Sequence, residues 1–163
     1  MLKRNMVVLF IVVISAITLS CKDSIGTASY GDSNSQHRIL VTGTTSDFKL
    51  GILEEIVGRY AGTCYIRFIP YRDIDLDSIS DYSAILIMDE CQAWMVFNGK
   101  VKRLVDKIER KERITLLLTA GDPDWEYSRN GVDAVTSASV EDSRDGVVHE
   151  IISSIDGLVG LSE

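Results

Sequence analysis

The strongest constraint on the fold is a repeated change of hydrophobic period along residues 38–159. Apolar runs typical of buried strands occur at residues 38–43, 65–69, 84–88, 114–119 and 132–138. Apolar residues recur at helical spacing in three other stretches, at residues 53–60, 101–108 and 148–155. Apolar strands joined by amphipathic helices predict an α/β fold, a three-layer sandwich in which helices cover both faces of a five-stranded parallel sheet.

Length, charge and cysteine content narrow the class of protein. The 163 residues suit one domain, and the formal net charge of -7 argues against nucleic-acid binding, which needs clustered Lys and Arg. No CxxC pair or Cys/His cluster has metal-ligand spacing, so no metal site is expected. Cys64 and Cys91 fall at opposite ends of neighbouring predicted strands, and we expect free thiols there rather than a disulfide.

The N-terminus reads as a targeting segment. Lys3 and Arg4 precede an apolar run over residues 6–14, which is too short to span a membrane comfortably. The following Thr18-Leu19-Ser20-Cys21 resembles the lipobox of bacterial lipoproteins. The resemblance implies a signal peptide over residues 1–20, lipidation of Cys21 and a place in the bacterial cell envelope, periplasmic or on the outer surface. The alternatives are a signal peptide cut elsewhere and an uncleaved anchor helix.

Residues 21–36 are rich in Ser, Gly, Asp and Asn, a composition that predicts a flexible tether ahead of a domain over residues 37–163. Loss of residues 1–20 would remove two positive charges and leave a formal net charge of -9. Anionic lipid headgroups repel such a body, so the lipid on Cys21, rather than surface charge, is expected to hold the domain at the membrane.

The loop after the first strand is the first candidate site, because parallel sheets bind ligands beyond the carboxyl ends of their strands. Thr44, Thr45 and Ser46 lead directly into the first helix. Hydroxyls and backbone N–H groups at a helix N-terminus suit an anion such as phosphate. The alternative is that Ser46 or Asp47 only caps the helix.

Both tryptophans fall on loops at this same edge, Trp94 after the third strand and Trp125 after the fourth. Aromatic side chains on neighbouring loops can sandwich a flat ring, and the alternative is that each covers a patch of the core. Acidic residues gather at the same edge, namely Asp89, Glu90, Asp122, Asp124 and Glu126.

These features resemble the flavodoxin-like family over about residues 38–159. The resemblance rests on the strand order, on the hydroxyl-rich first loop, on the Trp94 loop, and on Asp81-Tyr82-Ser83-Ala84-Ile85-Leu86-Ile87, which is similar to the family's "DYDAIII" entry to the third strand. It implies FMN as cofactor. By position, the residues implied are Thr44, Thr45 and Ser46 for the phosphate, and Trp94 with Trp125 or Tyr127 for the isoalloxazine ring.

The chain departs from that family in two places. The stretch over residues 44–49 lacks the Gly-Asn-Thr part of the family's phosphate loop, and Asp47 there repels a phosphate, whereas Lys49 offsets that charge if it points inward. Residues 122–130 are short for a parallel crossover, which needs about a dozen residues. Either a single helical turn is enough to connect the fourth and fifth strands, or the fifth strand lies at the edge of the sheet and is not paired as a parallel crossover requires.

Two hypotheses of function follow. In the first, the chain is a membrane-anchored electron carrier in which FMN does the chemistry and a redox partner protein exchanges electrons with it. In the second, it is a flavin-free module that binds or scaffolds partners in the envelope. An enzyme with its own catalytic residues is the weaker reading, because His37 borders the tether and His149 lies within the closing helix.

Overall fold

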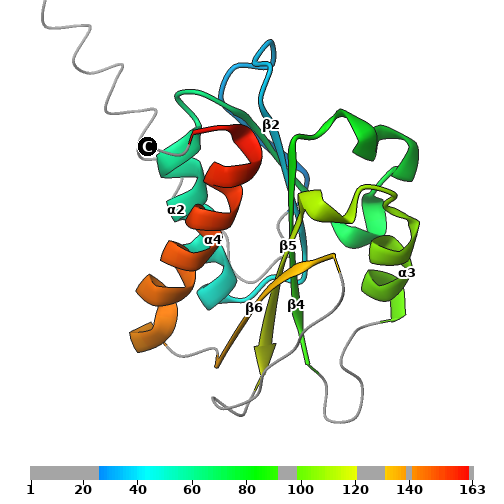
Figure 1. The fold of residues 1–163 in the computed structure, drawn as a ribbon. Coiled ribbons are helices and arrows are strands. Elements are labelled where there is room, and N and C mark those ends of the chain that lie inside the picture. Colours follow the sequence, from blue (N-terminus) through cyan, green and yellow to red (C-terminus); the bar gives the residue numbers. More distant parts are fainter. Residues whose placement is uncertain (1–25, 92–98, 121–130, 139–140, 162–163) are drawn as a thin grey trace, which may run out of the picture.

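The computed structural model describes residues 26–91, 99–120, 131–138 and 141–161, which form helices on both faces of a six-stranded sheet (Figure 1). The strands are β1 (Ala28–Tyr30), β2 (Arg38–Gly43), β3 (Tyr65–Pro70), β4 (Ala84–Glu90), β5 (Ile114–Ala120) and β6 (Asp133–Ala138). The helices are α2 (Asp47–Tyr60), α3 (Gly99–Lys107) and α4 (Arg144–Val159). Short 3₁₀ turns are η1 (Tyr71–Asp73), η2 (Leu76–Asp81), η3 (Lys111–Arg113) and η4 (Glu141–Ser143). The predicted α/β sandwich is confirmed.

The sheet has the order β1-β3-β2-β4-β5-β6, and the five strands β2 to β6 are all parallel to one another. Val41 of the central strand β2 lies opposite Phe68 of β3 on one side and Leu86 of β4 on the other. The chain order therefore reverses between β2 and β4, where such folds bind ligands. Because β6 pairs in parallel with β5, the alternative of a differently paired edge piece is wrong. The connection over residues 121–130 lies outside the described residues.

Strand β1 corrects the sequence analysis in two respects, since the sheet has six strands rather than five and part of the predicted tether is folded. Ala28–Tyr30 pairs antiparallel with β3. Ala28 and Tyr30 also pack against the core cluster beneath α2. At Gly31 the backbone has φ +80°, and a Cβ there would overlap the carbonyl oxygen of Cys64. The sequence did not predict β1, because three residues within a polar stretch are too few to show an alternating strand pattern. The hydrogen bonds of β1 come from its pairing with the edge of β3.

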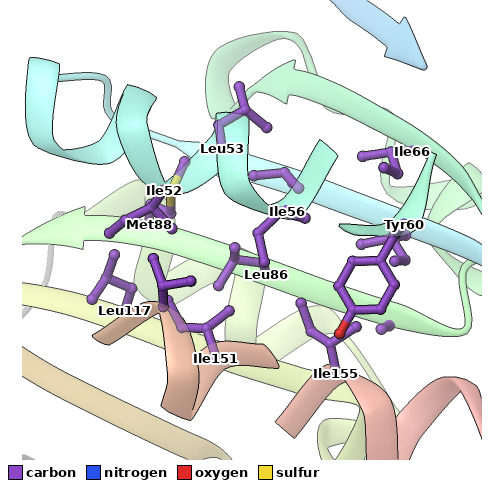
Figure 2. Packing of buried hydrophobic residues seen from close by; sticks show 14 of the residues in the cluster. Ile52, Leu53, Ile56, Tyr60, Ile66, Leu86, Met88, Leu117, Ile151 and Ile155 are labelled. Atoms are coloured by element: carbon purple, nitrogen blue, oxygen red, sulfur yellow. The ribbon is translucent and has the colours of Figure 1, made fainter. Parts of the chain in front are cut away.

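Helices α2 and α4 lie side by side on one face of the sheet (Figure 1), and Figure 2 shows the core between them and the strands. Ile52 and Ile56 from α2, with Ile151 and Ile155 from α4, are all fully buried. They pack over strand residues that include Leu86, Met88 and Leu117. The predicted helical spacing therefore marks the buried stripe of each helix.

The other face is covered by α3 together with the turns η1 and η2 (Figure 1). Val101 and Val105 of α3 are fully buried, and Ile108 just beyond the helix is nearly so. They belong to a second core cluster that includes Ile85 and Ile87 of β4. This cover is shorter than the opposite one, since α3 has nine residues where α4 has sixteen.

The predictions about membrane targeting concern residues 1–25, which lie outside the described residues. Among the helices that the structure describes, none combines the length and the apolar character needed to cross a bilayer. The signal peptide and the lipidation of Cys21 stay predictions.

Candidate functional site

The loop after β2 is held tightly against the neighbouring strand. The backbone N–H of Thr44 donates to the carbonyl oxygen of Met88 in β4, over 2.8 Å. Gly43 has φ +138°, and a Cβ at this position would overlap that same carbonyl. Only glycine allows this close approach without strain. The loop is thus fixed where the strand order reverses, between the carboxyl ends of β2 and β4.

Ser46 caps helix α2, as one of the two alternatives predicted. Its hydroxyl oxygen accepts a hydrogen bond from the backbone N–H of Lys49, over 3.3 Å. The N–H groups of Asp47 and Phe48, the first two residues of the helix, have no acceptor within it. The positive end of the helix dipole lies at the same place, so the start of α2 favours an anion.

Lys49 points inward, the condition under which the sequence analysis gave it a role. Its side chain is buried, with 1% of its surface exposed, and Nζ donates to the hydroxyl of Thr44 over 2.6 Å. Burial lowers the pKa of the Lys49 ammonium, and the carboxylates of Glu90 and Asp89 act in the opposite direction. A desolvated cation therefore lies beside the predicted phosphate loop.

Two acidic residues end strand β4 close to this cation. Asp89 is fully buried, whereas Glu90 is exposed. The hydroxyl of Thr119 in β5 donates to the backbone carbonyl of Asp89 over 3.3 Å, which ties the ends of the two strands together. The two carboxylates that act on Lys49 therefore give two formal negative charges against its one positive charge, and Asp47 at the start of α2 is exposed.

The other predicted phosphate ligands differ in their surroundings. Thr45 is exposed and Thr44 is half-buried. Both line a pocket of about 210 Å³, which Phe68, Tyr71 and Arg72 close on the side of β3. Arg72 was missed by the sequence analysis, and its place three residues after a predicted strand is the signal that points to it. Trp94, Trp125 and Tyr127 lie outside the described residues, as do the acidic Asp122, Asp124 and Glu126.

The two described cysteines lie far apart in the fold. Cys64 precedes β3 at the amino edge of the sheet and Cys91 follows β4 at the carboxyl edge, as predicted, and no disulfide joins them. Burial raises the pKa of the Cys64 thiol. Within the described ranges, no group of three His, Cys, Asp or Glu side chains is placed to hold a metal ion.

Comparison with known proteins shows the fold. No protein-family model matches the chain, and no curated protein does. A solved structure of a flavodoxin from the domain Archaea matches with a TM-score of 0.52 and 10% identity, over 74% of this chain and 98% of the other. Oxidised Flavodoxin 2 from Bacillus cereus matches with a TM-score of 0.52 and 9% identity, over 74% of this chain and 99% of that flavodoxin. The chain therefore contains a domain with a flavodoxin-like fold.

Proposed function

We propose that the protein binds FMN at the carboxyl edge of its sheet and acts as an electron carrier, held in the bacterial cell envelope by a lipid on Cys21. The observation that carries this proposal is the buried ammonium of Lys49, which lies at the start of α2 and contacts Thr44. The flavodoxin-like fold supports it, because the loop over residues 44–46 follows β2 where the strand order reverses, and such sheets bind ligands at that edge.

The residues of this loop fit a phosphate group. The Lys49 ammonium has three N–H donors and uses one on Thr44, and Thr45 is exposed and carries a further hydroxyl donor. Together with the first N–H groups of α2, these donors would hold the phosphate of FMN. A phosphate would also give the desolvated ammonium an opposite charge in a partly buried setting, where charge pairs interact more strongly than in water.

FMN, when bound, supplies one-electron and two-electron redox chemistry. The chain's own contribution is to hold and orient the cofactor and to set the charge around it. If FMN is bound, negative charge from Glu90 and Asp89 would disfavour an anionic reduced flavin and so lower its reduction potential. Stacking of the ring by Trp94 with Trp125 or Tyr127 stays part of the proposal.

A titration of the full chain with FMN and with riboflavin tests the proposal, with visible absorbance and tryptophan fluorescence as readouts. Because riboflavin lacks the phosphate, we expect Lys49→Met to weaken FMN binding by about tenfold or more and to leave riboflavin binding unchanged. Lys102→Met, an exposed lysine on α3, is the matched control and should alter neither. An equal loss of affinity for FMN and for riboflavin in Lys49→Met would contradict the assigned role of Lys49.

The pH dependence of binding gives a second test. Since desolvation lowers the pKa of Lys49, the free protein loses this positive charge at a lower pH than an exposed lysine would. FMN affinity should therefore decrease with rising pH below the usual lysine range, and riboflavin affinity should not follow. A flat FMN profile up to about pH 10 would argue against a charged contact.

A flavin-free binding module in the envelope is the second candidate function, and one observation favours it. The hydroxyl of Ser46 caps α2 and that of Thr44 accepts from Lys49, while Asp47, Asp89 and Glu90 leave the loop with an excess of negative charge. In this case Lys49 is a structural cation. Absence of FMN binding, together with a lower melting temperature for Lys49→Met, would favour this second function.

A further inference from the structure

Helix α3 and the residues that follow it differ in charge from the rest of the chain. Residues 99–113 contain seven Lys and Arg against three Asp and Glu, a formal charge of +4 in a chain of net charge -7. All other residues together therefore carry -11. This segment is therefore a positive region on an acidic protein, which steers partners of opposite charge, and the neighbouring residues 71–81 carry four Asp against one Arg.

Hollows in the surface follow this same region. One of about 280 Å³ lies between η2 and the end of α3, and a second of about 300 Å³ continues toward η1, with Leu76 and Lys107 lining both. A third of about 340 Å³ adjoins the first at Ser80 and Arg110. We call this continuous surface the basic groove, defined by apolar Leu76, Ile79 and Ile108 and by cationic Arg103, Lys107 and Arg110.

Some cations of this face have structural roles. Lys111 donates from Nζ to the carbonyl oxygens of Val105 and Ile108, and so caps the end of α3. Arg113 donates to the carbonyl oxygens of Ser80 and Tyr82 and so fixes η2 to the start of β5. These contacts hold the walls of the basic groove in place.

Other groups of the basic groove are available to a partner. Lys107 forms no ion pair or hydrogen bond with any other described residue, and Arg103 bonds only a backbone carbonyl, that of Gly99. Arg110 pairs with Glu112 at 2.7 Å, but both side chains are more than half exposed, so this pair is weak. Leu76 is the one large hydrophobic side chain that is exposed among the described residues, at 36%.

We propose that the basic groove binds an acidic segment of a partner protein, with an apolar side chain between Leu76 and Ile108 and carboxylates facing Lys107 and Arg103. Charge complementarity supports this occupant, because the charged residues that line the first two hollows are Arg72, Arg103, Lys107, Arg110 and Arg113 against a single acidic residue, Glu109. The row of hollows suits an extended chain with alternating side chains better than one compact molecule. The inference is independent of FMN binding, since none of these groups belongs to the loop over residues 44–46.

Fluorescence anisotropy of labelled peptides with the full chain, held in nanodiscs of neutral phosphatidylcholine, tests the proposal. The probes are ten-residue peptides of alternating Glu and Leu, alternating Lys and Leu, and alternating Glu and Ser. We expect saturable binding of the Glu-Leu peptide alone, weakened by added salt. Lys107→Glu should weaken it by about tenfold. Leu76→Ser should weaken it by about fivefold through loss of the apolar contact.

Lys102→Glu is the matched control, because it reverses one charge on the same helix outside the basic groove. It should change the affinity by less than about twofold, and unchanged melting temperatures should show that all variants are folded. Equal weakening by Lys102→Glu and Lys107→Glu, equal binding of the Lys-Leu peptide, or no binding of the Glu-Leu peptide up to about 1 mM would overturn the proposal. So would preferential binding to phosphatidylglycerol vesicles, which would assign the surface to a membrane.

Discussion

The two faces of the sheet are covered in different ways. On one, α2 and α4 pack side by side over a continuous buried cluster, and Tyr60 joins them through its hydroxyl, which donates to Asp156 over 2.7 Å. On the other, α3 and the turn η2 leave the basic groove between them, with Leu76 exposed at its edge. Both faces contribute to the core, but the second combines its apolar groups with several cationic side chains at the surface, whereas the hollow on α2 has Glu54 as its charged residue.

This difference separates stability from binding within one domain. The face of α2 and α4 places its polar contacts at a helix junction, where Arg59 also pairs with Asp156 at 2.7 Å. The face of α3 keeps Lys107 and Arg103 on the surface, where they add little to stability. Substitutions on the first face should therefore reduce stability, and those on the second should change recognition.

A pair of matched core substitutions should show the largest effect. Ile155→Ala leaves a cavity between α4 and the sheet, because the side chain is fully buried, and should lower the free energy of unfolding by about 4 kcal/mol. Ile108→Ala borders the basic groove, where solvent fills the space, and should cost only about 2 kcal/mol. Urea unfolding measures both. Equal losses would mean that the two faces are closed to the same degree.

The helix junction should show a smaller effect. Tyr60→Phe removes hydrogen bonds to the carboxylate of Asp156 and the carbonyl of Ile152, and should lower the free energy of unfolding by about 1–2 kcal/mol. Tyr65→Phe is the control, since its hydroxyl bonds only Ser29 at an exposed edge. Thermal unfolding of both variants checks the difference. If both variants lost a similar free energy of unfolding, the hydrogen bonds of Tyr60 at the helix junction would contribute no more to stability than an exposed one.

Acid should weaken this same junction. Burial raises the pKa of Asp156, but the hydrogen bonds from Arg59 and Tyr60 outweigh it and hold the pKa of the folded state below its usual value. The junction's contribution is thus present above about pH 4 and is lost as pH falls through the lowered pKa. Asp156→Asn should be less stable than wild type at neutral pH and should lose less on acidification. The prediction would be contradicted if the free energies of unfolding of wild type and Asp156→Asn fell in parallel from about pH 6 to pH 2.

Substitutions at the basic groove should have the smallest effect on stability. Leu76→Ser and Lys107→Ala alter exposed side chains, so each should change the free energy of unfolding by less than about 0.5 kcal/mol. Chemical denaturation of these variants is the measurement. A loss of about 2 kcal/mol or more would mean that η2 closes over α3 in solution and that the groove is part of the core.

Prediction from the sequence succeeded for elements with a strong hydrophobic periodicity. It failed for a strand that forms only by pairing with a segment far away in the sequence. The apolar runs of β4 and β5 were predicted to within two residues of their ends, whereas the helical stripe of α2 was predicted from residue 53, six residues after the helix begins. Strand β1 was missed, because its pairing depends on the edge of β3, whose partner residues lie 36 to 40 positions further along the chain. At the candidate site, the role of Ser46 was left open between a ligand and a cap, and the structure shows the cap.

The sequence by itself determined the class of fold, because alternating strand and helix periods bury their apolar faces in only a few layered arrangements. Tertiary structure alone decided that Lys49 is desolvated and that Thr44 accepts its hydrogen bond. It also decided that Leu76 and Lys107, 31 positions apart, line one groove. Burial and charge environment are sums over neighbours brought together by folding, and no local pattern of residues contains them.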